Sequence, residues 1–527
     1  MFDTLLRGGT VIDGTGRAAF AADVAIENGK IAAVGQLSHA QARRTVDCAG
    51  MTVTPGFIDI HRHADGAAFR PGFGEWELCQ GLTTIVNGNC GLSAAPFGPD
   101  NEAAIRAYLQ PITGDLPPRL DSRSLAGYFR SLPALPLNVG MLVGAGTLRA
   151  DAAGYQLTEL ADGHFAAIHC QMEQALSDGA LGVSLGLGYA PECFYSTADL
   201  IRALQPVAGT DIPVTVHMRQ EGGGVVESVR EMIAVARALD CPVHISHLKA
   251  MGRDNWGKKI PQVLTLLEQA QNEGLRVDCD VYPYTAGSTQ LLHILPPDYL
   301  TGGMEAVVER LKDKEVRRQL AARIESGVGF DDIAKLAGWD GIYLTSLHCL
   351  EDHPYQGHNL MEIAALMGQD PLSSCCELLA REHGQITMID FMASEEDICA
   401  ILRSPLSCVI SDATYPTEGQ LHPRVCGNVT HLLEHFVREK KALSWEQAVH
   451  KLTGRPAQVL GLTGKGRLEA GYDADVCVFA PEALHERATY TEPQQTSQGM
   501  SLVLVAGEIA LENGKPTGIC AGRAVRR

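Results

Sequence analysis

Short apolar runs alternate with longer amphipathic segments along most of the chain. Eight runs rich in Val and Ile occupy residues 54–63, 82–91, 136–144, 180–189, 212–219, 242–249, 276–284 and 406–413. Intervening segments such as 164–179, 225–240 and 261–274 carry apolar residues three and four apart, which is typical of helices packed against a sheet. Strands alternating with helices indicate an α/β fold, and eight such units predict a closed (β/α)8 TIM barrel over residues 54–465.

The two chain ends have a different pattern, with short alternating strands and Asn-Gly turns. Residues 1–53 and 466–527 both have it, and we expect them to pair into one small β-sandwich domain. The connection between the seventh and eighth runs is much longer than the others. It predicts an inserted lid subdomain over about residues 285–345, at the mouth of the barrel.

Composition limits the class of partner. The 527 residues carry a net charge of -19, so duplex nucleic acid is not an expected partner, because phosphate binding needs clustered Lys and Arg. No apolar run of about 18 residues and no secretory leader occur, which predicts a cytoplasmic protein with no membrane segment. The 15 Cys residues are scattered and are expected to be reduced thiols. The sequence is also compatible with assembly into a homo-oligomer.

Metal-binding side chains recur where the predicted strands end. The first strand ends in GFIDIHRHAD, which places His61 and His63 on one face because strand side chains alternate. Four further strands, the second, fifth, sixth and eighth, end at Cys90, His217, His247 and Asp412. Taken singly, each has an ordinary structural explanation, as a core residue or a helix N-cap. Because barrel strand ends converge at one mouth, the set together predicts a metal site.

Several longer motifs carry a resemblance to a known family. They are TTIVNGNCG at 83–91, VHMRQEGG at 216–223, VHISHLKAMGRDNWGK at 243–258, DVYPYTAGST at 280–289, SDAT at 411–414, HPRVCGN at 422–428 and GRLEAGYDADVCVFAP at 466–481. With the strand-end ligands, they resemble the amidohydrolase superfamily, and most closely its N-acyl-D-amino-acid deacylase (D-aminoacylase) branch. The resemblance implies a hydrolase that cleaves the amide bond of N-acyl-D-amino acids, giving a carboxylate and a free D-amino acid.

The resemblance also implies how the metal is held. Many members of the superfamily bridge two metals with a carboxylated lysine at strand 4, but LGLGYAPE at 185–192 contains no lysine. The deacylase branch uses a cysteine from strand 2, which is Cys90. Since thiolate suits zinc and is a poor ligand for Mg²⁺ or Ca²⁺, the expected metal is zinc.

Roles for the ligands follow from zinc chemistry. Cys90, His217 and His247 are expected to hold a tight zinc, while His61, His63 and Asp412 line a second, weaker position. Asp412 fits the role of general base, taking a proton from water and passing it to the departing amine. For the other nearby acid, Glu221, a supporting or surface role is favoured.

Substrate contacts are implied by the resemblance alone. It places Lys249, Tyr282, Ser288 and Arg424 around the α-carboxylate of the substrate, with Tyr189 near its acyl or side-chain end. Arg62 and Glu192 depart from the residues common in the branch and bear on substrate preference.

The segment after Ser288 bears on the side chain of the substrate. Leu291, Leu292, Ile294 and Leu295 favour neutral, apolar D-amino acids over D-glutamate, because a carboxylate in a closed pocket needs a cation. Arg62 is a cation that could reverse this preference.

Two other functional classes were compared with the deacylase. A cyclic-amide hydrolase of the hydantoinase or dihydroorotase kind would share fold and metal chemistry, but the absent strand-4 lysine and the context of Cys90 argue against it. A metal-free scaffold would have lost ligands, and none is lost here.

Overall fold

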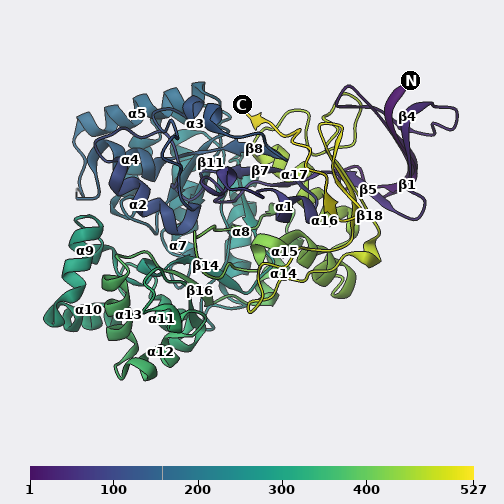
Figure 1. Ribbon diagram of the computed structural model, residues 1–527. Helices are drawn as coiled ribbons and strands as arrows, with labels where there is room; N and C mark the ends of the chain where they lie inside the picture. The colour runs from purple at the N-terminus through teal and green to yellow at the C-terminus, as the bar shows by residue number, and fades with distance from the viewer. Residues whose placement is uncertain (157) are drawn as a thin grey trace.

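The computed structural model describes residues 1–156 and 158–527 and shows a mixed α/β fold (Figure 1). Its parallel strands are β6 (Phe57–Asp59), β7 (Leu82–Asn87), β8 (Asn138–Met141), β9 (Val143–Gly144), β10 (Val183–Gly186), β11 (Val214–His217), β12 (Val243–Ile245), β13 (Val277–Val281) and β17 (Ser407–Val409). Every predicted apolar run contains one of these strands, and the third run contains both β8 and β9. The predicted order of strands is therefore confirmed.

Hydrogen bonds arrange these strands in two parallel groups. One has the order β22 (Ala524–Val525), β8, β7, β6, and the other has the order β17, β13, β12, β11, β10, β9. Leu142, between β8 and β9, donates its N–H to the carbonyl of Asn87. The two groups also meet where β17 lies next to β6. There the Asp412 N–H donates to the His61 carbonyl and the His63 N–H donates to the Ala413 carbonyl, each at 2.9 Å. The segment after β17 thus lies directly beside the segment after β6.

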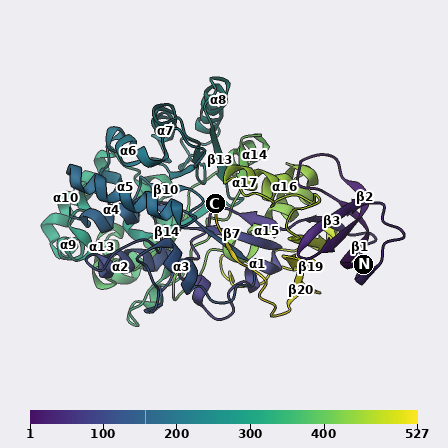
Figure 2. The same ribbon diagram turned by 90° about the horizontal axis from the view of Figure 1, so that it is seen from above.

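Helices lie outside the parallel strands, as Figure 2 shows for α4 to α8. They are α1 (Glu75–Cys79), α2 (Glu102–Thr113), α3 (Leu125–Ser131), α4 (Ala145–Ala153), α5 (Asp162–Ser177), α6 (Thr197–Ala203), α7 (Val225–Leu239), α8 (Lys259–Asn272), α14 (Glu395–Arg403), α15 (Arg424–His431), the π-helix η8 (Leu432–Glu439), α16 (Trp445–Leu452) and α17 (Gly454–Val459). The three segments predicted from apolar periodicity are α5, α7 and α8. In α7, Val225, Val229, Met232 and Ala236 are buried in one core with the strands, which is the stripe that the spacing predicts.

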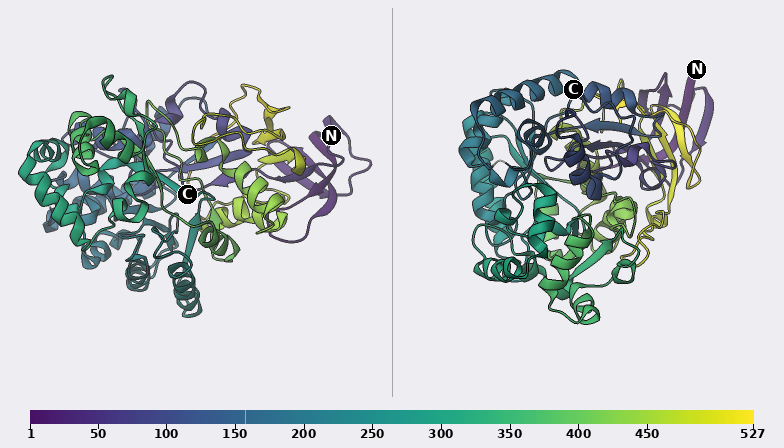
Figure 3. Two further views of the ribbon diagram at one scale, coloured as in Figure 1. Left: turned by 90° about the horizontal axis from the view of Figure 1, so that it is seen from below. Right: turned by 60° about the vertical axis from the view of Figure 1, so that its left-hand side comes forward.

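Both chain ends contribute strands to one mixed sheet of nine strands, which lies at one end of the molecule (Figure 3). Its strands are β1 (Phe2–Val11), β2 (Phe20–Glu27), β3 (Lys30–Gly35), β4 (Ala42–Asp47), β5 (Thr52–Pro55), β18 (Val476–Phe479), β19 (Met500–Val505), β20 (Glu508–Glu512) and β21 (Lys515–Pro516). Asn28 and Gly29 form the two-residue turn between β2 and β3, both at positive φ, as an Asn-Gly hairpin requires.

A segment between β13 and β17 forms its own sheet and helices, drawn in green at the lower left of Figure 1. It contains β14 (Ala286–Gln290), α9 (Gly303–Lys312), α10 (Lys314–Ser326), α11 (Ile333–Ala337), β15 (Ile342–Ser346), α12 (Leu360–Met367), α13 (Pro371–Arg381) and β16 (Thr387–Phe391). The strands pair in the order β14, β16, β15. We call residues 286–391 the inserted segment. Its apolar core includes Leu291, Leu292, Ile294 and Leu295.

Two further findings concern the whole chain. All 15 cysteines lie in the described residues, and none is in a disulfide. Among the helices that the structure describes, none is both long and apolar enough to cross a membrane.

Candidate active site

Three of the predicted metal ligands lie on left-handed turns directly after parallel strands. The φ angles are +53° at Cys90, +39° at His247 and +54° at Asp412. Residues with a Cβ rarely adopt this conformation, and holding one there costs about 1–3 kcal/mol. The turns bring donor atoms of the three side chains within 4.8 Å of one another. His217, the last residue of β11, forms an adjoining group with Glu221 and His247.

The first-strand histidines contact the ligands from strands 2 and 8. His61 Nε2 lies 3.2 Å from Cys90 Sγ and 3.4 Å from Asp412 Oδ1. His63 Nε2 is 3.3 Å from the same Asp412 oxygen. Cys90 is thus enclosed between the first strand and its neighbours, with 3% of its surface exposed.

The ligands from strands 5 and 6 complete the cluster. His247 Nε2 is 3.5 Å from Cys90 Sγ and 3.1 Å from His217 Nδ1. One ligand atom each from His61, Cys90, His247 and Asp412 lies within 4.8 Å of the others. The structure therefore brings together all six side chains that the sequence singled out.

Burial sets the charge states in this cluster. It lowers the pKa of His61 and of His217 well below the ordinary value, so both rings are neutral and offer lone pairs. Burial opposes ionisation of Asp412, but the Arg424 guanidinium and the neighbouring histidines together outweigh it and hold the pKa of Asp412 well below its usual range. Two neutral imidazoles and a carboxylate around a buried thiol form a donor set that suits a borderline-soft cation.

Glu221 is buried and touches a predicted ligand. Its Oε1 is 2.9 Å from His247 Nδ1, and its Oε2 accepts a hydrogen bond from Lys249 Nζ at 2.8 Å. Lys249 Nζ also lies 2.8 Å from His247 Nδ1, so this nitrogen contacts both the carboxylate and the ammonium group. In the tautomer whose Nδ1 faces Glu221 as a donor, the Nε2 of His247 is free to bind a metal. The expected supporting role for Glu221 agrees with this position, whereas a surface location does not.

The predicted carboxylate-binding residues gather beside Asp412. Arg424 is fully buried, lies 3.1 Å from Asp412 Oδ2 and covers the Tyr282 ring at 4.7 Å. Its Nη2 donates to the Ser288 carbonyl, while its Nε and Nη1 find no hydrogen-bond partner among the described residues. Two unsatisfied donors on one buried guanidinium form an anion-binding feature.

A small cavity of about 40 Å³ lies over the cluster. All the predicted ligands except His61 line it, and the other polar lining residues are Glu221, Lys249, Tyr282, Ser288, Thr289, His293, Asp390 and Thr414. Apolar lining comes from Leu92, Ile112, Met251, Ile333 and Met392. Tyr189 also lines it, with its hydroxyl 2.8 Å from Thr289 Oγ1 and its ring against His217. The walls of this cavity are therefore formed partly by the ends of the parallel strands and partly by the inserted segment.

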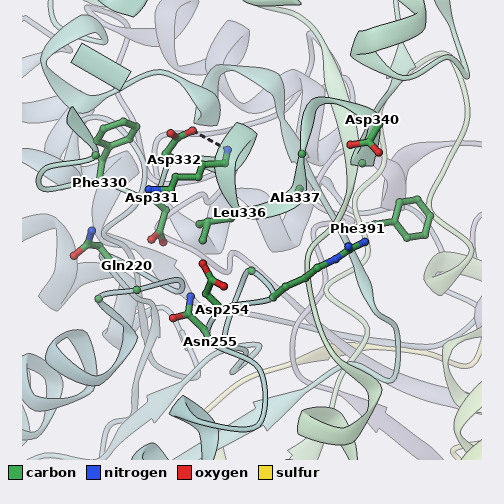
Figure 4. Close-up of a pocket in the computed structure, with 18 residues that line it drawn as sticks. Gln220, Asp254, Asn255, Phe330, Asp331, Asp332, Leu336, Ala337, Asp340 and Phe391 are labelled. Carbon is green, nitrogen blue, oxygen red and sulfur yellow. Dashed lines mark hydrogen bonds between the residues drawn. The ribbon is translucent and has the colours of Figure 1, made fainter. Parts of the chain in front are cut away.

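A larger cavity of about 650 Å³ lies between the inserted segment and the loops after β11 and β12 (Figure 4). None of the predicted site residues lines it. Asp331 separates it from the cluster, because its carboxylate accepts hydrogen bonds from the backbone N–H groups of Glu221 and Gly222.

Comparison with known proteins agrees with this geometry. The amidohydrolase family matches residues 44–511. The chain belongs to this family.

Three curated relatives from Alcaligenes xylosoxydans xylosoxydans match nearly end to end. A D-aminoacylase is 33% identical and covers 100% of the chain and 98% of its own length. An N-acyl-D-glutamate deacylase is 35% identical, with 100% and 96% covered, and an N-acyl-D-aspartate deacylase is 32% identical, with 98% and 93% covered.

Solved structures give the same result. An N-acyl-D-glutamate deacylase from Bordetella bronchiseptica, complexed with zinc and a phosphonate mimic of the tetrahedral intermediate, has a TM-score of 0.83 at 31% identity, with both chains fully covered. A D-aminoacylase, whose binuclear metal centre is described by one-metal activation and second-metal attenuation, has a TM-score of 0.84 at 32% identity over the full length of both chains. An L-hydantoinase from Arthrobacter aurescens has a TM-score of 0.57 at 16% identity, which shows the fold alone.

The residues expected to set substrate preference lie elsewhere in this amidohydrolase. Arg62 is fully buried in contacts with Asp59, Glu77 and Tyr415, so it is not a cation of the cavity. Leu291, Leu292, Ile294 and Leu295 are buried in an apolar cluster that the inserted segment shares with the parallel strands, and they do not line the cavity over the ligands. Glu192 lies beneath Gly91, at 1.8 Å from where a Cβ would stand. The expectation that the four apolar residues form a pocket wall is wrong, because apolar side chains after a strand fill a core first. The expectation that Arg62 is a cation of the pocket is wrong, because buried acids already enclose it.

Buried acids that support the ligand turns were missed from the sequence. Asp59 Oδ1 accepts the backbone N–H of His61 at 3.2 Å and of Ser411, the neighbour of Asp412, at 3.1 Å. Asp280 accepts the backbone N–H of His247. A signal existed, since each acid interrupts an apolar strand run and a buried carboxylate needs partners.

Glu192 gives the amidohydrolase a pH-dependent stability. Burial raises the pKa of Glu192 from 4.5 to about 8, so the folded state holds a proton that the unfolded state has released. Wild-type stability therefore falls as pH rises between these values, and Glu192→Gln removes this loss. The free energy of unfolding of the variant relative to wild type should rise by about 1 kcal/mol per pH unit between pH 5 and 8. Urea unfolding of both proteins across this range measures it, and parallel curves would contradict it.

Proposed function

We propose that this amidohydrolase is a zinc-dependent N-acyl-D-amino-acid deacylase that hydrolyses the linear amide bond to a carboxylate and a free D-amino acid. The observation that carries the proposal is the convergence of His61, Cys90, His247 and Asp412 on one point. Similarity to named deacylases over the full length supports the reaction and its D-stereochemistry.

We also propose a domain arrangement for this function, with a barrel, a domain of the two chain ends and an inserted subdomain. Eight parallel strand units whose last segment lies beside the first favour a closed (β/α)8 barrel. The nine-stranded sheet supports a small domain built from both chain ends. The pairing of β16 with both β14 and β15 supports an inserted subdomain over residues 286–391, which is longer than the 285–345 expected from the sequence.

The donor set fits zinc, and its surroundings suggest unequal positions. Cys90, His217 and His247 would hold the tight zinc, because Nδ1 of His247 is in contact with Glu221 at 2.9 Å and Lys249 at 2.8 Å, and such neighbours orient a ligating ring. His61, His63 and Asp412 would form the weaker position. Within the part of the chain that the structure describes, Nδ1 of His61 and of His63 is buried without a hydrogen-bond partner, so neither ring has this support. Cys90 touches ligands of both groups and is placed to bridge them.

The chemistry divides between the metal and Asp412. Zinc, when bound, would polarise the amide carbonyl and acidify water. Asp412 takes the proton of the attacking water and delivers it to the departing nitrogen, without which an amide is a very poor leaving group. Arg424 holds one carboxylate oxygen at 3.1 Å, so the other faces His61 and His63.

Binding of the substrate carboxylate is assigned to the group beside Asp412. Arg424 has two unsatisfied N–H donors, and Lys249, Tyr282 and Ser288 line the cavity. Tyr189, in the turn after β10, is assigned to the acyl or side-chain end. A fixed arrangement of cation and hydroxyl donors is what a free α-carboxylate requires.

The alternative is a cyclic-amide hydrolase of the hydantoinase or dihydroorotase kind. It shares the fold, but strand β10 and the turn after it carry no lysine, and similarity to hydantoinase structures is low. The oligomeric state and a cytoplasmic location stay predictions of the sequence.

One assay separates the candidate functions. Purified protein loaded with zinc should release acetate and D-methionine from N-acetyl-D-methionine, with at most traces of product from N-acetyl-L-methionine or dihydrouracil. Product formation is followed by chromatography, and bound zinc by elemental analysis. Opening of dihydrouracil without deacylation would establish the alternative, and a protein that binds no zinc would exclude both.

The bridging role of Cys90 predicts a linked loss. Cys90→Ala removes the thiolate between the two ligand groups, so zinc content should fall together with a roughly 100-fold or greater loss of kcat. Cys170→Ala is the matched control, because Cys170 is exposed on α5. Full zinc content and normal turnover in Cys90→Ala would show that the thiolate is dispensable.

The general base is tested by an isosteric change. Asp412→Asn keeps the shape but cannot accept a proton, so kcat should fall by about 100-fold or more at unchanged folding. Steady-state kinetics and circular dichroism measure the two quantities. If Asp412→Asn retains kcat while Glu221→Gln loses it, the base is Glu221.

Substrate preference follows from the cavity lining. Leu92, Ile112, Met251, Ile333 and Met392 favour an apolar side chain, and the Asp390 carboxyl disfavours an acidic one. We expect kcat/KM for N-acetyl-D-leucine to exceed that for N-acetyl-D-glutamate by about tenfold or more. A preference for the glutamate derivative at equal zinc and pH would reject this assignment.

A further inference from the structure

A row of alternating charges lies beneath the turn that presents His247. His244 on β12 is 1% exposed, with Nδ1 2.6 Å from Asp278 Oδ1 and Nε2 2.7 Å from Asp280 Oδ2. The other oxygen of Asp278 accepts from Arg455 of α17 at 2.8 Å. The register of the parallel strands pairs His244 with Asp278, which puts both on one face. Arg455, Asp278, His244 and Asp280 thus alternate in sign toward the ligand cluster.

This row ends on the backbone of a predicted zinc ligand. Asp280 Oδ1 accepts the N–H of His247, whose φ is +39°. A residue with a Cβ holds this conformation only where the surroundings enforce it, at a cost of about 1–3 kcal/mol. The N–H of the turn is therefore fixed by a carboxylate that is itself fixed by His244.

The same group is not a second metal site. His244, Asp280 and Cys408 place donor atoms within 4.8 Å of one another, but both ring nitrogens of His244 already face carboxylates. Burial alone would lower the pKa of His244, yet the two aspartates outweigh it and raise that pKa well above its usual value. A protonated imidazole donates through both nitrogens and has no lone pair for a metal.

We propose that His244 and Asp280 are positioning residues that hold the strained turn of His247, and so set how long the tight zinc stays bound. The inference rests on the proposed function only in taking His247 as a zinc ligand. Losing a partner that orients a metal ligand typically costs about 10–100-fold in metal affinity or activity. Because His247 belongs to the tight site, the effect should appear first in zinc release.

The experiment measures zinc release directly, in the full-length zinc-loaded protein. The dissociation rate is followed by transfer of zinc to a chromophoric chelator in excess. Asp280→Asn puts an amide group where two donors need acceptors, so the rate should increase by about 10-fold or more, with kcat reduced and KM little changed. Asp278→Asn, at the more exposed end of the row, should give a smaller increase in the same direction.

A matched control separates positioning from loss of stability. Asp475 is also a buried carboxylate, paired with Lys465 at 2.6 Å in the sheet of the chain ends. Asp475→Asn should lower the unfolding temperature without changing the zinc dissociation rate. If Asp280→Asn does not fold, Asp278→Asn gives the decisive rate.

The outcomes are distinct. Wild-type rates in both row variants, or the same rise in Asp475→Asn, would overturn the inference. Since zinc release needs no substrate, faster release from Asp280→Asn would support it even if the protein failed to deacylate any substrate tested. Conversely, a confirmed deacylase with unchanged zinc release in the row variants would leave the proposed function intact and reject the positioning role.

Discussion

Buried carboxylates hold the metal-binding turns in a conformation that their own residues disfavour, and the site depends on this constraint. Cys90, His247 and Asp412 all have positive φ. Asp280 takes the N–H of His247, while Asp59 takes the N–H groups of His61 and of Ser411, beside Asp412. Glu192 fills the space beneath Gly91, which only glycine leaves open. Hydrogen bonds from the strands below thus hold the His247 turn and the residue before Asp412, so these side chains are directed toward one another without a cation.

The sequence predicted the strand order and the ligands for the same reason. Parallel strands of equal direction bring their carboxyl ends together, so a His, Cys or Asp at each end is both a mark of the strand and a candidate ligand. His61 and His63 were identifiable from strand alternation alone. The turns after the strands were not, because nothing in a single residue such as Cys90 indicates that its φ is positive.

Contacts between segments far apart in the chain could not be predicted from the sequence. The position of Arg62 between His61 and His63 suggested a cation that lines the pocket, yet Glu77 and Tyr415 enclose its side chain. Arg424 was expected near the substrate carboxylate, but its contact with Asp412 Oδ2 requires α15 to lie against the end of β17. The apolar residues after Ser288 resembled a pocket wall and proved to be core. A sequence gives polarity and period, whereas the partner of a buried charge depends on the finished fold.

Chemistry and selectivity come from different parts of the chain. The candidate ligands lie at or directly after strand ends, whereas Ser288, Ile333 and Asp390 line the cavity from the inserted segment. A cavity of about 40 Å³ holds little more than water, so in the proposed deacylase the inserted segment would have to move or adjust for a substrate side chain to enter. Asp331 connects the two parts, because it holds the backbone N–H of Glu221, whose carboxylate contacts His247 and Lys249. Changes in the inserted segment away from Asp331 can therefore alter substrate preference while the metal ligands and their supporting carboxylates stay in place.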